Sequence, residues 1–185
     1  MTQLWLVRHG RARGQAGRAV GSTDLALDGH GKHQARRAAL ALKARPLDAV
    51  YSSDRVRAIA TAEAIAASHG LDVEIRADLR ELDFGAWEQR DLAQLWEEAP
   101  ELAEAWAADI TAIPDGFGEG FDELSARVAS FASQLAQTGH REVAVVAHRG
   151  SLTALLAHCR GISFAQAWQQ PLGHGMVCGC VLAPC

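Results

Sequence analysis

The chain has no apolar run long enough to span a membrane, although 49% of its 185 residues are hydrophobic. A membrane-spanning helix needs about 20 consecutive apolar residues. The residues before the first apolar run carry no charged side chain, whereas a secretory signal begins with a basic segment. We therefore expect a protein with no membrane partner that works in the cytoplasm.

Cysteine is scarce and unevenly placed. All four residues fall in the last 27 positions, at Cys159, Cys178, Cys180 and Cys185. A disulfide framework would distribute its cysteines across the fold, so we predict reduced thiols. A metal site built on Cys178 and Cys180 would need a second cysteine pair, which is missing. Alternation along a β-strand explains their spacing, and we predict neither a metal nor another cofactor.

Two further absences limit the class of ligand. No glycine-rich segment is followed by Gly-Lys-Ser or Gly-Lys-Thr, which excludes a P-loop nucleotide-binding protein. The net charge of −4 divides into +7 over residues 1–60, −14 over 61–125 and +3 over 126–185, so no extended basic face is present. Nucleic acid is therefore excluded as a partner, and a small phosphorylated metabolite is expected. We make no prediction of the oligomeric state.

The chain alternates between apolar runs and amphipathic segments. Strands are predicted at residues 4–7, 47–51, 73–75, 143–147 and 176–182, and helices at 32–44, 54–70, 88–110, 121–137 and 151–158. This order predicts an α/β fold, a three-layer α/β/α sandwich with a mostly parallel central sheet. The length favours a single domain over residues 1–185, with a lid-like helical excursion at about 84–120.

The second predicted helix follows the Ser-Ser-Asp run at residues 52–54. Such side chains cap helix N termini, so we expect this run to provide the cap. The spacing of Val56, Ile59, Ala60 and Ala64 predicts that these residues form the buried side of the helix.

Arg8, His9 and Gly10 directly follow the first buried strand. A glycine after the histidine lets the backbone turn and lets a ligand approach closely. Residues 10–21 contain four glycines, three arginines and no acid, which indicates an anionic ligand. Because α/β proteins bind ligands at the carboxyl ends of their strands, we interpret His9 as a nucleophile beside a phosphate clamp.

The strand at 143–147 also ends on a histidine, in the triplet His148-Arg149-Gly150. If the two strands are parallel neighbours, both imidazoles lie at the same edge of the sheet. One then attacks phosphorus while the other, when protonated, donates to a phosphoryl oxygen; the ordinary histidine pKa of about 6.5 makes both states accessible. Arg8 and the glycine-rich loop favour His9 as the nucleophile.

Further arginine and carboxylate candidates leave two choices open. Arg57 lies in the first turn of a predicted helix, where free N–H groups favour an anion, but Arg55 is equally available. Arginine suits this role because it binds phosphate bidentately and stays charged. A leaving alkoxide needs a proton, and either Glu81 or Asp83 provides the general acid.

Four segments, in this order, match the motifs of a known family. They are Val7-Arg8-His9-Gly10; Tyr51-Ser52-Ser53-Asp54 with Arg57-Ala58 and Thr61-Ala62; Leu79-Arg80-Glu81 with Phe84-Gly85-Ala86-Trp87-Glu88; and Val146-Ala147-His148-Arg149-Gly150. Together they resemble the histidine phosphatase superfamily, also called phosphoglycerate mutase-like, over roughly residues 4–160. The resemblance implies a hydrolase, a metal-independent phosphomonoesterase that forms a phosphohistidine intermediate.

The resemblance also implies a role for each residue. His9 is the phosphorylated nucleophile, and Arg8, Arg57 and His148 hold the phosphoryl group. Glu81 is the acid that later activates water. The family pattern therefore selects the first candidate of each pair that the residues alone leave open.

The loop after the triplet departs from the family pattern. Arg11 and Ala12 stand where an acid or glutamine and then a threonine or serine are common, so a local hydroxyl contact is missing. Gln15 replaces the usual asparagine and is expected to donate its amide to phosphate. The usual Gly-Glu-Ser segment is here Gly118-Glu119-Gly120, so the carboxylate is kept and the serine is replaced by glycine.

Residues 84–90, together with Ile113-Pro114 and the segment 118–121, resemble the α-ribazole phosphatase branch. Such enzymes remove phosphate from α-ribazole 5′-phosphate, or its cobamide form, during assembly of the cobalamin nucleotide loop. The resemblance predicts that Gln15, Glu119 and Trp87 bind substrate. A lid with several indoles suits a flat aromatic base, although tryptophan is also common in cores.

Three alternatives remain beside this function. Two are enzymes, a broad-specificity histidine phosphatase and a phosphoglycerate mutase, and the chain lacks the longer inserts of the mutases. The third is a catalytically inactive module that binds a phosphorylated ligand. The intact set of five catalytic candidates argues against such a module.

Overall fold

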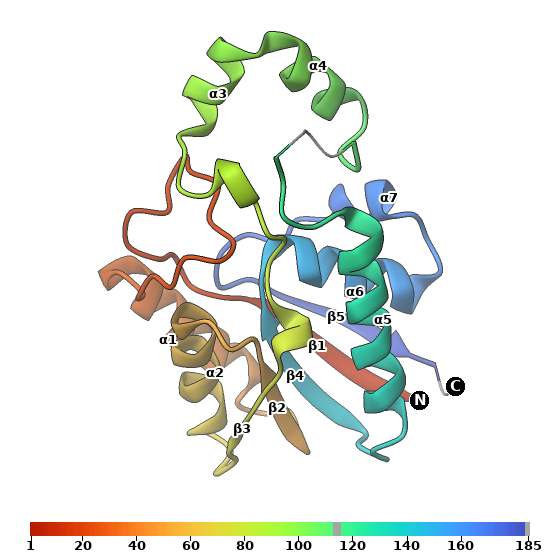
Figure 1. Ribbon diagram of the computed structural model, residues 1–185. Coiled ribbons are helices and arrows are strands. Elements are labelled where there is room, and N and C mark those ends of the chain that lie inside the picture. The colour runs from red at the N-terminus through yellow and green to blue at the C-terminus, as the bar shows by residue number, and fades with distance from the viewer. Residues whose placement is uncertain (113–115, 184–185) are drawn as a thin grey trace.

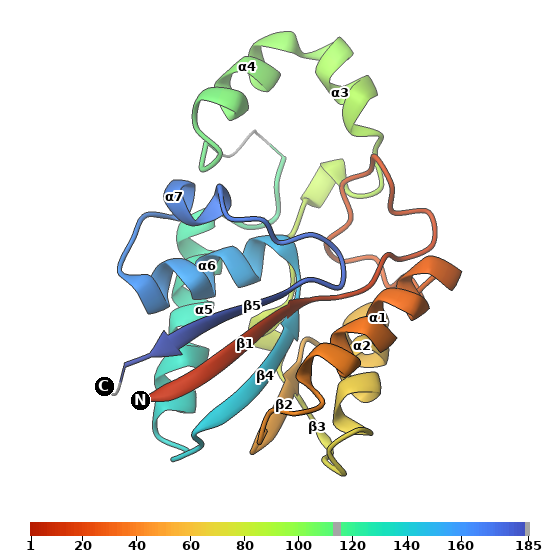
Figure 2. The same cartoon turned by 180° about the vertical axis from the view of Figure 1, so that it is seen from behind.

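The computed structural model describes residues 1–112 and 116–183 of the chain. In this part of the chain, helices cover both faces of a central sheet (Figures 1 and 2). One face carries α1 (Gly29–Leu42) and α2 (Val56–Ala66), and the other carries α5 (Phe121–Ala136) and α6 (Arg149–Arg160). The predicted three-layer α/β/α architecture is therefore confirmed. No helix among these residues is long and apolar enough to cross a membrane.

The sheet has five strands in the order β3-β2-β4-β1-β5. Their bounds are β1 (Thr2–Arg8), β2 (Ala49–Ser52), β3 (Val73–Ile75), β4 (Glu142–Ala147) and β5 (Val177–Leu182). The first four are parallel to one another, and β5 runs antiparallel to β1 at the edge. All five predicted strands exist, and β1 and β4 are the parallel neighbours that the two histidines require.

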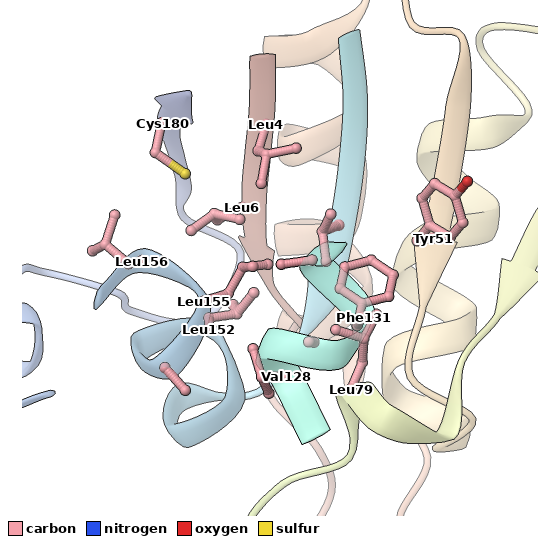
Figure 3. Packing of buried hydrophobic residues seen from close by; sticks show 14 of the residues in the cluster. Leu4, Leu6, Tyr51, Leu79, Val128, Phe131, Leu152, Leu155, Leu156 and Cys180 are labelled. Atoms are coloured by element: carbon pink, nitrogen blue, oxygen red, sulfur yellow. The ribbon is translucent and has the colours of Figure 1, made fainter. Parts of the chain in front are cut away.

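Apolar residues of β1 point to both faces of the sheet and pack into two separate cores. Leu4 and Leu6 of β1 face α5 and α6, whereas Val7 faces α1 and α2. Figure 3 shows Val128 and Phe131 of α5 packed on the first of these faces. Both faces of the central strands β2 and β4 are buried, which explains their runs of apolar residues, whereas β3 at the edge is half-buried or exposed.

The N terminus of α2 is capped from a distant loop. The N–H of Val56 donates to the Asp24 carboxylate at 2.7 Å, and the helix has no side-chain cap from its own N-cap residue. Asp54, which we expected to contribute to the cap, instead forms an ion pair with Arg80. The predicted local cap is therefore wrong, because both partners of the observed contacts lie more than 25 residues away in the sequence.

The buried side of α2 also differs from the prediction. Val56 is 44% exposed, and the buried residues are Arg57, Ala58, Thr61, Ala62, Ile65 and Ala66. Two polar side chains, Arg57 and Thr61, occupy the inner face of the helix. The predicted buried face is therefore wrong, because the apolar residues used to predict it lie beside the truly buried positions. Both polar residues on the buried face point toward the candidate site.

The excursion between β3 and α5 consists of several short helices. The expected single helix over 88–110 is wrong: it divides into α3 (Leu92–Glu98) and α4 (Pro100–Ala108). Ala99 adopts φ −142° and ψ 71°, because a following proline disfavours helical backbone at that residue. Residues 84–112 and 116–120, which we call the cap segment, extend beyond the carboxyl ends of the strands (Figure 1). Ile113-Pro114 lies outside the described residues.

Candidate active site

His9 lies directly after β1, the strand that lies between β4 and β5 in the sheet. Its backbone N–H donates to Ala147 O at the end of β4, at 3.0 Å, and its side chain is only 1% exposed. The ring Nδ1 lies 2.7 Å from Gly10 O. A carbonyl oxygen only accepts hydrogen bonds, so Nδ1 carries the proton of the neutral ring and Nε2 keeps its lone pair. The geometry therefore presents Nε2 as the nucleophilic atom.

His148 begins α6 beside His9, as the parallel pairing predicts. The two ring centroids are 4.9 Å apart, and His148 is fully buried. Its Nε2 lies 2.9 Å from Ser53 Oγ, at the end of β2. The carboxyl ends of three strands thus meet at one place, and two imidazoles share it.

Arg57 reaches the same place from the inner face of α2. It is fully buried, and its Nη1 and Nη2 donate to Thr23 O and Gly21 O at 2.7 and 2.9 Å. The other side of this loop donates three backbone N–H groups to Glu88, at 2.9 to 3.2 Å. Burial alone would raise the pKa of Glu88, but these donors together hold it below its ordinary value. Glu88 thereby fixes the loop that orients Arg57, a role that the sequence did not reveal.

Thr61 of α2 binds the backbone at the start of the loop after His9. Its Oγ1 accepts from Gly10 N at 3.1 Å and donates to Arg57 O at 2.8 Å. Ala12 is buried and pairs with Leu27 across an isolated bridge. The start of this loop is thus held by Thr61 of α2, and Ala12 by its bridge to Leu27.

Glu81 follows the 3₁₀ turn Ala77–Leu79, and its carboxylate accepts from Gly150 N at 2.9 and 3.2 Å. A Cβ atom at position 150 would lie 2.4 Å from Glu81 Oε1, so only glycine allows this approach. Arg127 of α5 donates to the carbonyl oxygens of Asp78, Arg80 and Glu81, at 2.8 to 3.1 Å. These contacts hold the segment that carries Glu81 from both sides.

Arg8 is the fifth residue of the group. The negative charge of the Glu81 carboxylate attracts the guanidinium groups of both Arg8 and Arg57. Burial lowers the pKa of each guanidinium, and the Coulomb attraction of Glu81 opposes the shift. Nε of Arg8, Nε of Arg57 and Nδ1 of His148 are buried with no hydrogen-bond partner among the described residues. Buried polar atoms without partners are costly, and a phosphoryl group supplies acceptors for the two arginine Nε–H groups. The structure thus brings together the five residues proposed for catalysis.

A cavity of about 670 Å³ lies between two of these residues, Arg8 and Glu81, and the cap segment. Its polar lining comes from Arg8, Gln15, Arg18, Glu81 and Arg149. The rest is mainly apolar and aromatic, with Phe84, Leu92, Trp96, Trp106, Ile110, Phe121 and Trp168. Arg149 stacks on the Trp168 ring, with its guanidinium carbon 4.4 Å from the ring centroid. An anionic group at one end and a flat apolar group at the other fit such a lining.

The three residues predicted to bind substrate occupy different places. Gln15 lines the 670 Å³ cavity, and its Oε1 accepts from Ala12 N at 3.3 Å. Trp87 is 7% exposed and packs against Trp106 and other rings in the core of the cap segment. Glu119 binds Arg127 at 2.6 Å and lines a second, more polar cavity of about 520 Å³. The structure thus brings only Gln15 to the large cavity.

Both histidines of the pair are held neutral. Burial lowers the pKa of His9 well below 6.5, and the neighbouring Arg57 adds to this effect. Burial also lowers the pKa of His148, with a further contribution from His9. A neutral His9 is the form that attacks phosphorus.

These shifts predict that the protein loses stability in mild acid. Below pH 6.5 the unfolded chain binds protons at positions 9 and 148 that the folded chain does not. Stability from these sites is therefore complete above pH 6.5 and falls as the pH is lowered, by about 1.4 kcal/mol per pH unit for each histidine. Urea unfolding between pH 7 and pH 5 measures this loss.

The matched test compares a His9→Gln/His148→Gln variant with His33→Gln. His33 is an exposed histidine on α1. The double variant is expected to lose less stability per pH unit than the wild type, whereas His33→Gln keeps the wild-type slope. Equal slopes in all three proteins contradict the prediction.

The model of the "Histidine phosphatase superfamily (branch 1)" matches residues 4–183. An adenosylcobalamin/alpha-ribazole phosphatase of Escherichia coli is 34% identical over 94% of this chain and 86% of its own length. A probable phosphoglycerate mutase of Proteus mirabilis is 36% identical over 88% of this chain and 76% of its own. The structure of a mycobacterial glucosyl-3-phosphoglycerate phosphatase superposes with a TM-score of 0.87 at 30% identity, covering 97% of this chain and 89% of that one.

Proposed function

Because the chain belongs to the histidine phosphatase superfamily, we propose that it hydrolyses α-ribazole 5′-phosphate, or the cobamide form of this ester, through a phosphohistidine on His9. The observation that carries this proposal is the junction of two unlike regions in one cavity. Arg8 and Glu81 line one part of it, where Arg8 adjoins the His9–His148 pair, and aromatic side chains line the rest. Phosphate removal requires the first, and a ribosylated aromatic base suits the second.

In the first step, Nε2 of His9 attacks phosphorus in line with the leaving oxygen. The N–P bond forms as the P–O bond breaks, and protonated Glu81 gives its proton to the leaving oxygen. Arg8, Arg57 and neutral His148 donate to the phosphoryl oxygens, and the two guanidinium groups balance their negative charge. The hydrogen bond from Nδ1 to Gly10 O keeps Nε2 directed at phosphorus and stabilises the positive charge that develops on the ring.

In the second step, Glu81 acts as a general base. Its carboxylate takes a proton from water, and the water oxygen attacks phosphorus as the N–P bond breaks. Inorganic phosphate leaves, His9 returns to its neutral form, and Glu81 is protonated for the next cycle. The same carboxylate therefore serves both steps, which is consistent with its fixed place between Gly150 N and the arginines.

The aromatic lining favours a large, flat leaving group over a small, charged one. Aromatic side chains stack on a planar base, and each such contact contributes about 1–3 kcal/mol. Phosphoglycerate would offer this lining only a short anionic chain. A transfer of phosphate back to glycerate would also require the product to stay bound, whereas the cavity leads away from Glu81 toward the cap segment.

A substrate panel tests the proposal. We expect kcat/KM for α-ribazole 5′-phosphate to exceed that for 3-phosphoglycerate and for simple alkyl phosphates by at least about 100-fold, the product of two stacking contacts. Release of inorganic phosphate, rather than an isomerised phosphoglycerate, distinguishes a phosphatase from a mutase. Equal kcat/KM for all esters indicates a broad-specificity phosphatase, and phosphate binding without turnover indicates an inactive module.

Trp96→Ala supplies the matched variant for this panel. Trp96 lines the cavity, so its loss is expected to raise KM for α-ribazole 5′-phosphate about tenfold and to change kcat/KM for alkyl phosphates less than twofold. Trp5→Phe is the control, since Trp5 stacks with Arg45 and does not line the cavity. An equal loss on all esters would contradict a role of the aromatic lining in selectivity.

A further inference from the structure

A third histidine, His174, adjoins the nucleophile from the side opposite His148. The antiparallel ladder between β1 and β5 pairs Val7 with Val177, and it continues beyond both strands. Gly175 N donates to Arg8 O at 2.9 Å, and Arg8 N donates to Met176 O at 3.3 Å. Figure 2 shows the chain before β5 beside the end of β1. The antiparallel register of β5 against β1 thus places residue 174 beside His9.

Two contacts join His174 to His9. Nδ1 of His174 lies 3.1 Å from the carbonyl oxygen of His9, and the two ring centroids are 5.1 Å apart. Because a carbonyl oxygen only accepts, Nδ1 of His174 is the donor. The ring of His9 is consequently flanked by two imidazoles. The ring centroid of His148, after β4, is 4.9 Å away, and that of His174, before β5, is 5.1 Å away.

The segment that carries His174 is itself tied to the site. Arg8 Nη1 donates to Leu172 O at 3.1 Å, and Arg149 Nη1 donates to Gln170 O at 2.8 Å. Arg149 also donates to Trp168 O. Residues 168–176, which we call the C-terminal loop, therefore receive hydrogen bonds from two arginines of the site. In return, the loop donates to the backbone of Arg8 and His9.

We propose that His174 is a positioning residue for His9, which fixes the backbone carbonyl and ring of the nucleophile so that Nε2 points at the substrate phosphorus. This inference rests on the proposed role of His9 as nucleophile. His9 O and Gly10 O are acceptors on successive peptide groups, one for His174 and the other for the ring of His9 itself. Together these bonds set the direction of the His9 side chain.

The protonation state of His174 suits this role. Burial, assisted by the positive charge of Arg8, lowers the pKa of His174 to about 4. The ring is therefore neutral at physiological pH. A neutral ring with its proton on Nδ1 donates one hydrogen bond to His9 O and adds no positive charge that would compete for the substrate anion.

Three substitutions at position 174 separate positioning from simple packing. His174→Asn keeps a donor at the place of Nδ1, because the side-chain nitrogen is the same number of bonds from Cα. His174→Gln moves the amide one bond farther out, and His174→Ala removes it. His33→Ala, at an exposed histidine of α1, serves as the control.

The measurement is the pre-steady-state burst of p-nitrophenolate from p-nitrophenyl phosphate, which reports transfer of the phosphoryl group to His9. In His174→Ala we expect the burst rate to fall about 100-fold, since a misplacement of 1 Å costs roughly that factor. Binding of inorganic phosphate is expected to stay within threefold of wild type, because Arg8, Arg57 and His148 are intact. His174→Asn should remain within fivefold of the wild-type burst rate, and His174→Gln should resemble the alanine variant.

A burst rate of His174→Ala within threefold of wild type overturns the positioning role. So does an asparagine variant as slow as the glutamine variant, and this pair decides the matter if the alanine variant does not fold. The wild-type protein tests the proposed function separately. If it shows neither a burst nor label on His9, the function fails with the inference, whereas a normal wild-type burst with unaffected variants removes the inference alone.

Discussion

His9→Ala is expected to lower phosphatase activity by at least about 10⁴-fold, the largest effect of any single substitution in this protein. The variant has no nitrogen that forms a bond with phosphorus, so the two-step path is lost. The clamp of arginines does not depend on the His9 ring, because Arg57 is held by Gly21 O and Thr23 O. Inorganic phosphate should therefore still bind.

The measurement combines steady-state kinetics with a ³²P-labelled phosphoester. Wild-type protein is expected to acquire acid-labile, alkali-stable label on His9, as phosphohistidine does, and His9→Ala none. His33→Ala tests for a general effect of losing a histidine, since that residue is exposed on α1. Full activity of His9→Ala would contradict the proposed mechanism.

Glu81→Gln is the second large effect. We expect kcat for alkyl phosphates to fall about 10³-fold, within the range that general acid–base catalysis contributes. Glutamine keeps an oxygen that accepts from Gly150 N, so the fold of the segment is retained. It neither gives a proton to the leaving alkoxide nor takes one from water.

The choice of leaving group shows which step is affected. p-Nitrophenolate leaves without a proton, so its burst should be nearly normal in Glu81→Gln, followed by slow hydrolysis of the phosphohistidine. The phosphoenzyme should then accumulate. Asp83→Asn is the matched control, since Asp83 accepts from Gly85 N and lines only the polar cavity of 520 Å³. If Asp83→Asn loses as much activity as Glu81→Gln, the assignment of the acid is wrong.

The positions of His9 and His148 could be predicted because local patterns determine them. Each follows a short apolar run that only a doubly covered parallel strand explains, and a glycine follows each within two residues. Parallel strands align their carboxyl ends, so two strand-end histidines meet if the strands are neighbours. In the structure β1 and β4 are parallel neighbours, and Arg8 is paired with Ala147.

The inner face of α2 could not be predicted by the same reasoning. Apolar periodicity assumes that buried residues are apolar, and Arg57 and Thr61 violate that assumption because the site needs their polar groups. Only the resemblance to a family selected Arg57 over Arg55. A local rule thus fails at the residues that carry function.

Glu88, Arg127 and His174 escaped prediction for another reason. Each acts through hydrogen bonds to backbone groups that lie 46 to 165 residues away in the sequence. Every residue except proline has the same backbone donor and acceptor, so no spacing of residue types reveals such a contact. A carboxylate that caps a loop and one that is solvated on a helix look alike until the loop is in place.

The pairing of β1 with β5 has a consequence for the order of events during synthesis. The nucleophile directly follows β1, whereas His174, in the chain that pairs with β1, is synthesised 165 residues later. At roughly 5–20 residues per second, His9 waits on the order of ten seconds for this partner. Until then this edge of β1 is unpaired and open to pairing with other chains. Completion of the catalytic centre and closure of this aggregation-prone edge are thus the same late step.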